Sequence, residues 1–168
     1  MTIPLALFNA SYIDNKPSGI GVVARDLANA FDKEVVNILD PIGKFNEGNI
    51  LIPNNLSPKY GTKGHIRRLL WTQNKLPKLI KKTGAEFLIS PLPEAPLFQG
   101  VKSIVLVHDL IPLRFPSSFI KKIFYKTYIP LVLKQSIHIL CNSYSTRHEL
   151  IKTYSIEPSK ISVIRLGY

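Results

Sequence analysis

Short apolar runs alternate with amphipathic segments along most of this 168-residue chain. Between residues 19 and 31, for example, Val23, Leu27, Ala30 and Phe31 recur at the spacing of one helical face. The apolar runs predict strands over residues 3–8, 35–39, 50–52, 87–89, 103–107, 137–140 and 161–164. The intervening segments predict helices over residues 19–31, over 63–82 with a break at Pro77, and over 119–134 with a kink at Pro130.

Strands that alternate with helices predict βαβ units, a parallel sheet and right-handed crossovers. We therefore expect an α/β fold with three layers (α/β/α), Rossmann-like, with a mostly parallel sheet. The length fits a single domain over residues 1–168. A further helix is predicted after residue 142, and two residues are candidates for its N-cap. Thr146 with Glu149 fits a capping box, and Ser143 is the other candidate.

A His-Asp pair follows the apolar run of the predicted strand over residues 103–107. Residues 104–107 (Ile-Val-Leu-Val) lead directly into His108 and Asp109. Ligands of open α/β sheets bind beyond the carboxyl ends of the strands, and histidine changes its charge near neutral pH. His108 is therefore a candidate for binding a ligand or moving a proton. The alternative is that Asp109 accepts backbone N–H groups as a helix cap or turn residue, with His108 merely its neighbour.

The glycine motif at residues 19–24 matches the dinucleotide-binding fingerprint GxGxxG/A, and Asp40 lies 21 positions beyond Gly19. In that fingerprint the first glycine comes directly after a strand. Here residues 9–18, which include Pro17, intervene. This spacing favours a second interpretation, in which Gly19 and Gly21 let the backbone approach a phosphate or a sugar. In a third interpretation these glycines only shape the loop.

Other catalytic patterns are weak. Asp109 and Glu94 have no spacing that fixes a glycosidase carboxylate pair, and no serine has the context of a nucleophile elbow. The four histidines and Cys141 lack the spacing of metal ligands, so we expect no metal site. Hydrolysis of these kinds is therefore not expected.

Positive charge is concentrated in the later part of the chain. Residues 1–57 hold 4 basic and 6 acidic residues, whereas residues 58–168 hold 18 and 5, which together give the net charge of +11. The segments 67–82 and 114–126 mix these cations with aromatic and aliphatic residues, a composition that suits an anionic membrane surface. The alternative is that their apolar faces pack on the sheet while the lysines face water. No nucleic-acid-binding motif is evident, so we expect no nucleic-acid partner.

The N-terminus and the cysteine content indicate a compartment. The first eight residues lack the basic region of a signal peptide, and no apolar run has the length of a membrane span. The single Cys141 excludes a disulfide within the chain and favours a reducing environment. We expect a cytoplasmic protein, which can also lie at the inner face of the membrane.

Three segments, in this order, resemble the glycosyltransferase family 4 type. They are Pro17-Ser-Gly19-Ile-Gly21, Val107-His108-Asp109-Leu110 with Pro112 and Pro116, and Asn142 to Leu150 followed by Ile156 to Gly167. The resemblance implies the N-terminal, acceptor-side half of a GT-B enzyme, in which two Rossmann-like domains enclose the active site. Members usually transfer a sugar from a nucleotide-sugar with retention and without a metal, so no cofactor is implied.

The resemblance also implies roles for individual residues. Gly19 and Gly21 would face the phosphates or sugar of the donor, and His108 would act at the reaction centre beside Asp109. Ser143 and Arg147 would open a helix near the cleft. The implied partners are a nucleotide-sugar and a saccharide or lipid-linked acceptor.

The C-terminal donor-binding domain of such enzymes is not in this sequence, so we expect a fragment that is inactive alone and that a second polypeptide could complete. The alternative function is a non-catalytic Rossmann-like module that binds a nucleotide or an anion.

Overall fold

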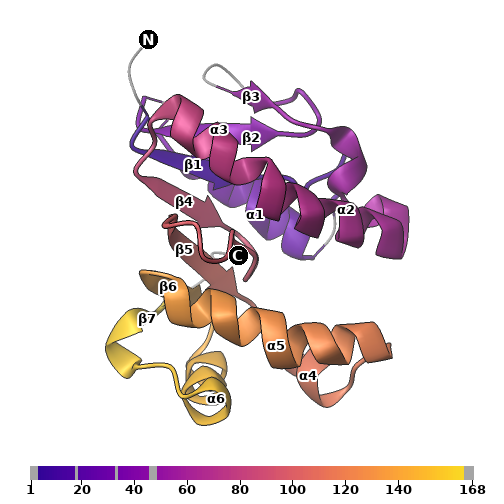
Figure 1. Ribbon diagram of the computed structural model, residues 1–168, viewed down its shortest axis with the longest axis vertical. Coiled ribbons are helices and arrows are strands. Elements are labelled where there is room, and N and C mark those ends of the chain that lie inside the picture. Colours follow the sequence, from indigo (N-terminus) through magenta and orange to yellow (C-terminus); the bar gives the residue numbers. More distant parts are fainter. Residues whose placement is uncertain (1–3, 18, 33, 46–48, 165–168) are drawn as a thin grey trace.

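Seven parallel strands form one sheet through the centre of the computed structural model (Figure 1). The structure describes residues 4–17, 19–32, 34–45 and 49–164. The strands are β1 (Ala6–Asn9), β2 (Val36–Asp40), β3 (Ile50–Leu51), β4 (Phe87–Ser90), β5 (Lys102–Val107), β6 (His138–Cys141) and β7 (Ile161–Val163). Their order across the sheet is β3-β2-β1-β4-β5-β6-β7, and every neighbouring pair is parallel. The predicted parallel α/β sheet is confirmed.

Helices connect the strands and pack on the sheet. They are α1 (Ile20–Ala30), α2 (Gly61–Asn74), α3 (Leu76–Thr83), α4 (Ile111–Arg114), α5 (Phe119–Gln135) and α6 (Tyr144–Tyr154). Three short 3₁₀ turns, η1 (Asn54–Leu56), η2 (Pro58–Tyr60) and η3 (Pro158–Lys160), complete the described elements. In Figure 1, α1 lies behind the sheet while α2, α3 and α5 lie in front of it.

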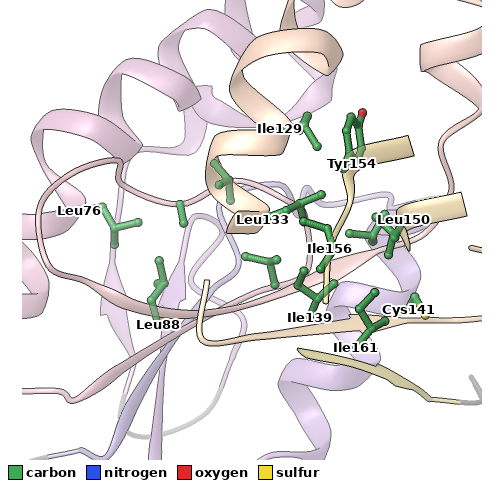
Figure 2. Close-up of a cluster of buried hydrophobic side chains, with 14 of the residues drawn as sticks. Leu76, Leu88, Ile129, Leu133, Ile139, Cys141, Leu150, Tyr154, Ile156 and Ile161 are labelled. Carbon is green, nitrogen blue, oxygen red and sulfur yellow. The ribbon is translucent and has the colours of Figure 1, made fainter. Parts of the chain in front are cut away.

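Two apolar clusters hold these layers together because alternate strand residues face opposite sides of the sheet. On one side, Ala24 and Ala28 of α1 pack with Phe8 and Ile38. On the other side, strand residues such as Ile139 pack with buried side chains of α3, α5 and α6 (Figure 2). The helix residues drawn there include Leu76, Ile129, Leu133, Leu150 and Tyr154. The predicted three-layer α/β/α arrangement is therefore confirmed.

The long predicted helix is broken two residues before the expected position. The break in the long predicted helix falls at Lys75, between α2 and α3, and Pro77 lies in the first turn of α3. A proline fits there because the first turn does not need its missing N–H group. Helix α5 continues through Pro130 to Gln135, and the kink expected at Pro130 stays a prediction.

Of the two candidate caps of α6, the structure has Ser143 and not Thr146. The Ser143 Oγ accepts a hydrogen bond from the backbone N–H of Thr146 at 3.1 Å. Thr146 is buried in the first turn, where its own Oγ1 donates to the backbone carbonyl of His108 at 3.2 Å. The start of α6 is therefore fixed both by its cap and by the segment that follows β5.

Candidate functional site

The strand order reverses between β1 and β4. From β1 the chain adds β2 and β3 toward one end of the sheet, and from β4 it adds β5, β6 and β7 toward the other end. Open α/β sheets bind their ligands at such a switch point, beyond the ends of the strands. We call the region beyond the carboxyl ends of the strands the carboxyl edge of the sheet. Gly19 and Gly21 follow β1, His108 follows β5, and Ser143 and Arg147 follow β6. Parallel strands therefore bring all of these segments to one edge, and their contact with a common ligand stays a prediction.

The ring of His108 is held by a carbonyl group of the neighbouring loop. Its Nε2 lies 3.0 Å from the backbone oxygen of Pro91, the residue that follows β4. A carbonyl oxygen can only accept, so Nε2 carries the proton in this contact and Nδ1 is the unprotonated nitrogen of the neutral ring. Burial lowers the pKa of His108 below 6.5, although the contact with Pro91 and the charge of Asp109 act in the opposite direction. At neutral pH the ring therefore offers Nδ1 as a hydrogen-bond acceptor.

Asp109 makes a backbone contact of the kind that the alternative interpretation expects, and its contact with a ligand stays a prediction. Its Oδ1 accepts a hydrogen bond from the backbone N–H of Ile111 at 2.9 Å, at the start of α4. The carboxylate therefore organises the turn that leads from β5 into α4. The His108 ring is positioned instead by the hydrogen bond that it donates to the backbone oxygen of Pro91.

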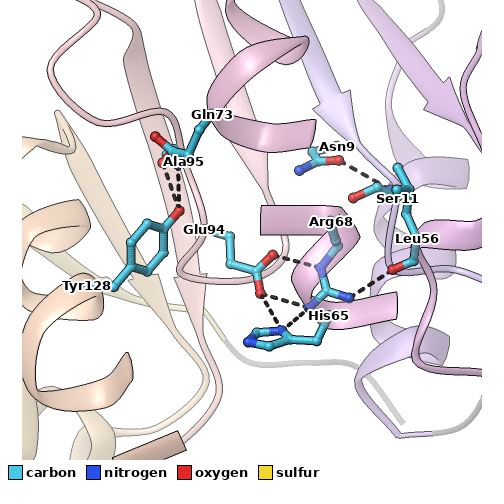
Figure 3. Close-up of polar contacts among 9 residues, drawn as sticks. All are labelled: Asn9, Ser11, Leu56, His65, Arg68, Gln73, Glu94, Ala95 and Tyr128. Carbon is cyan, nitrogen blue, oxygen red and sulfur yellow. Dashed lines mark hydrogen bonds and ion pairs between the residues drawn. The ribbon is translucent and has the colours of Figure 1, made fainter. Parts of the chain in front are cut away.

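The loop that carries Pro91 is anchored by a buried ion pair (Figure 3). Arg68 of α2 forms two hydrogen bonds with Glu94, from Nε to Oε2 at 2.7 Å and from Nη2 to Oε1 at 2.8 Å. Their side chains are only 4% and 5% exposed. Arg68 also donates from Nη1 to the backbone oxygen of Leu56 at 3.0 Å. This geometry ties the loop after β4 to α2 and to the segment after β3.

The same loop is also held by an amide and a phenol. Gln73 of α2 donates to the backbone oxygen of Ala95 at 3.0 Å and accepts from the backbone N–H of Leu97 at 2.9 Å. Tyr128 of α5 donates to the same Ala95 oxygen at 2.9 Å (Figure 3). Gln135, near the end of α5, donates to the backbone oxygen of Pro96. Side chains from two helices therefore fix the loop on which the position of His108 depends.

Aromatic and basic groups surround the ion pair. The guanidinium of Arg68 lies 5.1 Å from the centre of the Tyr12 ring, and His65 Nδ1 lies 3.0 Å from Arg68 Nη2. Burial alone would lower the pKa of Arg68, but the Glu94 carboxylate, with smaller contributions from Tyr12 and Tyr128, reverses this and raises it. Burial lowers the pKa of His65, although Glu94 opposes that shift. Arg68 therefore stays charged, and its charge is matched inside the protein.

Glycine is favoured at positions 19 and 21 for different structural reasons. Gly19 has φ 51° and ψ −118°, a conformation that glycine adopts far more easily than other residues, and it is exposed at the start of α1. Gly21 is buried, and a Cβ at this position would lie 3.0 Å from the Cβ of Pro17. Gly21 thus lets the loop pack on the helix, as in the loop-shaping interpretation. Gly19 alone leaves its backbone accessible to a ligand.

The dinucleotide interpretation finds no support at Asp40. Its carboxylate is buried and accepts hydrogen bonds from the backbone N–H groups of Ile42, Gly43 and Phe45, at 2.8, 2.8 and 3.0 Å. Asp40 therefore holds the turn after β2. Ten residues, 10–19, separate β1 from α1, so the glycines do not follow a strand directly.

Ser143 and Arg147 make structural contacts at the start of α6. Ser143 is the N-cap, and Arg147 donates from Nη2 to the backbone oxygen of Pro158 at 3.2 Å and from Nε to that of Ile161 at 3.5 Å. These bonds connect α6 to the segment that enters β7. Any contact of these two residues with a ligand stays a prediction.

Two cavities open among the segments that follow the strands. The first, of about 640 Å³, is lined by residues after β1, β2 and β3, which include Asp14, Ile42, Asn54, Ser57 and Tyr60. The second, of about 360 Å³, lies between α2 and the start of α5 and is lined by residues that include Tyr12, His65, Arg68, Ser118 and Lys121. Among the described residues that line them, none is Gly19, Gly21 or His108.

Arg68, Glu94 and Pro91 are the site-forming residues that sequence reasoning missed. Arg68 is read from the sequence as one cation of a basic segment, and Glu94 only as half of an unconvincing carboxylate pair. One signal was present, because Arg68 shares the buried face of α2 with Gly64 and Trp71. A charged residue on such a face requires a buried partner.

Within residues 4–17, 19–32, 34–45 and 49–164, no three His, Cys, Asp or Glu side chains are grouped so that they could hold a metal ion. None of the helices in this described part is long and apolar enough to cross a membrane.

Comparison with known proteins identifies the family. The chain is 29% identical over 119 residues to the O-antigen chain mannosyltransferase RfbU of Salmonella typhimurium (strain LT2), an alignment that covers 68% of this chain and 33% of that protein. The chain thus spans about a third of the length of this curated relative. The family model of Glycosyltransferase Family 4 matches residues 17–168, which include the glycine loop, His108 and the start of α6. The chain therefore belongs to Glycosyltransferase Family 4.

Proposed function

We propose that this chain is the acceptor-side domain of a retaining glycosyltransferase, which moves a sugar from a nucleotide-sugar to a saccharide or lipid-linked acceptor. The family membership and the mannosyltransferase relative support sugar transfer, and the name of that relative suggests a hexose donor. The carboxyl edge, with its switch point between β1 and β4, is the surface that would face the donor.

The observation that carries this proposal is the fixed ring of His108. With Nε2 bound to the Pro91 oxygen at 3.0 Å, Nδ1 remains to accept a hydrogen bond from a sugar hydroxyl. The backbone of His108 is held as well, through its carbonyl contact with Thr146. A group held in this way can orient a substrate at little entropic cost. His108 would therefore position the transferred sugar or the acceptor hydroxyl.

Gly19 would serve the donor. Its exposed backbone lies at the start of α1, where N–H groups have no partner within the helix and the helix dipole favours negative charge. These N–H groups could approach a phosphate or the transferred sugar. The remaining contacts to the nucleotide and diphosphate would come from a donor-binding domain, in the same or a second polypeptide. No metal is needed in this scheme, because backbone dipoles and basic side chains would stabilise the leaving diphosphate.

The larger cavity suits the acceptor. Its lining includes Asp14, Asn54 and Tyr60, whose side chains can hydrogen-bond to hydroxyl groups. A saccharide supplies the hydroxyl groups that such a lining requires.

A transfer assay tests the proposal. The domain is combined with its donor-binding domain and incubated with GDP-mannose, UDP-glucose or UDP-N-acetylglucosamine and a panel of oligosaccharides. We expect mass spectrometry to find an acceptor extended by one sugar with one of these donors. Release of free sugar without extension of any acceptor, or nucleotide binding without turnover, would contradict the proposal and favour the non-catalytic module.

A further inference from the structure

Large apolar side chains are exposed on α4 and on the first turns of α5. Ile111 is 60% exposed, Phe115 77%, Phe119 75%, Ile120 59% and Ile123 46%. Helix α4 packs against α5, so these residues come from adjoining segments, at the lower right of Figure 1. Every residue from Phe119 to Ile123 is exposed, so this end of α5 projects from the body of the domain. We call Ile111, Phe115, Phe119, Ile120 and Ile123, with the lysines described next, the α4–α5 surface.

The charge of this surface has one sign. Lys121, Lys122 and Lys126 are exposed among the apolar residues. No acidic residue occurs between Asp109 and Glu149 in the sequence. Arg114 also lies in this segment, but its charge is matched by an ion pair with Glu149 of α6.

We propose that the α4–α5 surface docks on a lipid bilayer that contains anionic phospholipids. Apolar side chains at the projecting end of a helix can enter the boundary between headgroups and acyl chains, while nearby lysines contact the phosphates. The composition favours lipid over a protein partner, because protein interfaces are depleted in lysine relative to the rest of the surface. This inference does not depend on the sugar-transfer proposal, since docking requires no catalysis.

The two basic segments, 67–82 and 114–126, have similar compositions but differ in which of their side chains are exposed. In the segment 67–82, Arg68 and Trp71 are buried, and Leu76 and Ile80 belong to the core. Its exposed lysines, which include Lys78, Lys81 and Lys82, lie opposite these packed faces. This segment therefore matches the alternative interpretation, in which apolar residues pack inward and lysines face water. The segment 67–82 does expose Leu70, at 58%, but the second segment, 114–126, presents four large apolar side chains, Phe115, Phe119, Ile120 and Ile123, together with its cations.

The α4–α5 surface adjoins the smaller of the two cavities at the carboxyl edge. Ile120 and Lys121 of the α4–α5 surface also line the 360 Å³ cavity, together with Tyr12, His65 and Arg68. Docking on a membrane would therefore place this cavity next to the lipid headgroups. A saccharide carried on a lipid could reach the carboxyl edge without leaving the membrane.

Vesicle sedimentation tests the proposal on the 168-residue chain. The partition coefficient is measured with vesicles of phosphatidylcholine alone and of phosphatidylcholine mixed with phosphatidylglycerol. We expect stronger binding to the anionic vesicles, and weaker binding as salt is added. The triple variant Lys121→Gln, Lys122→Gln, Lys126→Gln should reduce binding on the order of 100-fold, from about fivefold per cation. The double variant Phe115→Ser, Phe119→Ser should reduce it by about tenfold or more.

Matched controls separate location from composition. The triple variant Lys78→Gln, Lys81→Gln, Lys82→Gln removes the same charge from exposed positions of α3. The variant Leu70→Ser removes a leucine of α2 that is 58% exposed. Both should bind vesicles like the wild type. The proposal is overturned by absence of vesicle binding, by equal losses in the two lysine variants, or by a dimer in solution that the Phe115→Ser, Phe119→Ser variant abolishes.

Discussion

Replacing Glu94 by glutamine should destabilise the domain far more than a loss of one surface charge. The change removes a carboxylate that accepts two hydrogen bonds from Arg68, at 2.7 and 2.8 Å. It leaves the guanidinium charge at a position where the side chain is 4% exposed. The variant keeps the shape of the side chain, so the effect reports the electrostatics of the pair rather than a cavity.

The magnitude follows from the burial of the pair. Breaking a buried ion pair by removing one partner costs about 3–5 kcal/mol, since the remaining charge has lost its compensation. For a domain of this size, each kcal/mol shifts the melting temperature by about 2–4 °C, so we expect a drop of about 6–20 °C. Replacing both partners, in Arg68→Met with Glu94→Leu, should cost much less, because no unpaired charge then remains.

Urea and thermal unfolding followed by circular dichroism measure these changes. The control is Asp26→Asn, which neutralises the carboxylate of an exposed ion pair with Arg25 at a similar distance, 3.0 Å. The side chains of that pair are 44% and 60% exposed, so its loss should cost less than about 1 kcal/mol. The reasoning is refuted if Glu94→Gln and Asp26→Asn lower the free energy of unfolding equally.

Two further predictions concern protonation and ligand affinity. Burial lowers the pKa of His65 and His108, so NMR titration should find midpoints below 6.5 for both. The unfolded chain then binds more protons than the folded one below that pH, so these groups should make the free energy of unfolding fall on acidification through 6.5. Midpoints above 6.5 would contradict this, because they would show that the Glu94 and Asp109 carboxylates outweigh the effect of burial. Calorimetric titration of the 168-residue chain with GDP-mannose, UDP-glucose and UDP-N-acetylglucosamine should find weak binding, because most nucleotide contacts are assigned to the donor-binding domain. Micromolar binding by the chain alone would contradict that assignment.

The layers of the fold could be predicted because they depend on local patterns. Apolar runs such as residues 103–107 and the helical spacing of Val23 and Leu27 identify elements without reference to the rest of the chain. The errors lie at boundaries that tertiary contacts decide. Pro77 begins a helix rather than breaking one, and Thr146 is buried against the backbone of His108, so that Ser143 takes the cap.

The site was predictable only where a residue follows a strand. His108 and Gly19 could be placed at the carboxyl edge from the order of elements alone. The groups that hold His108 could not, because they depend on contacts between distant segments. Arg68 and Glu94 are 26 residues apart, and the Pro91 oxygen is a backbone group that no side-chain motif reveals.

The central claim is that His108 contacts a sugar during transfer. The measurement is kcat/KM for sugar transfer by this domain combined with the donor-binding domain proposed above. It is made with wild-type His108 and with His108→Ala. His108 is only half-buried at the end of β5, so the variant should fold with an unchanged circular dichroism spectrum. We expect kcat/KM to fall on the order of 100-fold or more, the usual scale for a positioned polar group. A folded variant that transfers sugar at the wild-type rate would show that His108 takes no part in the reaction.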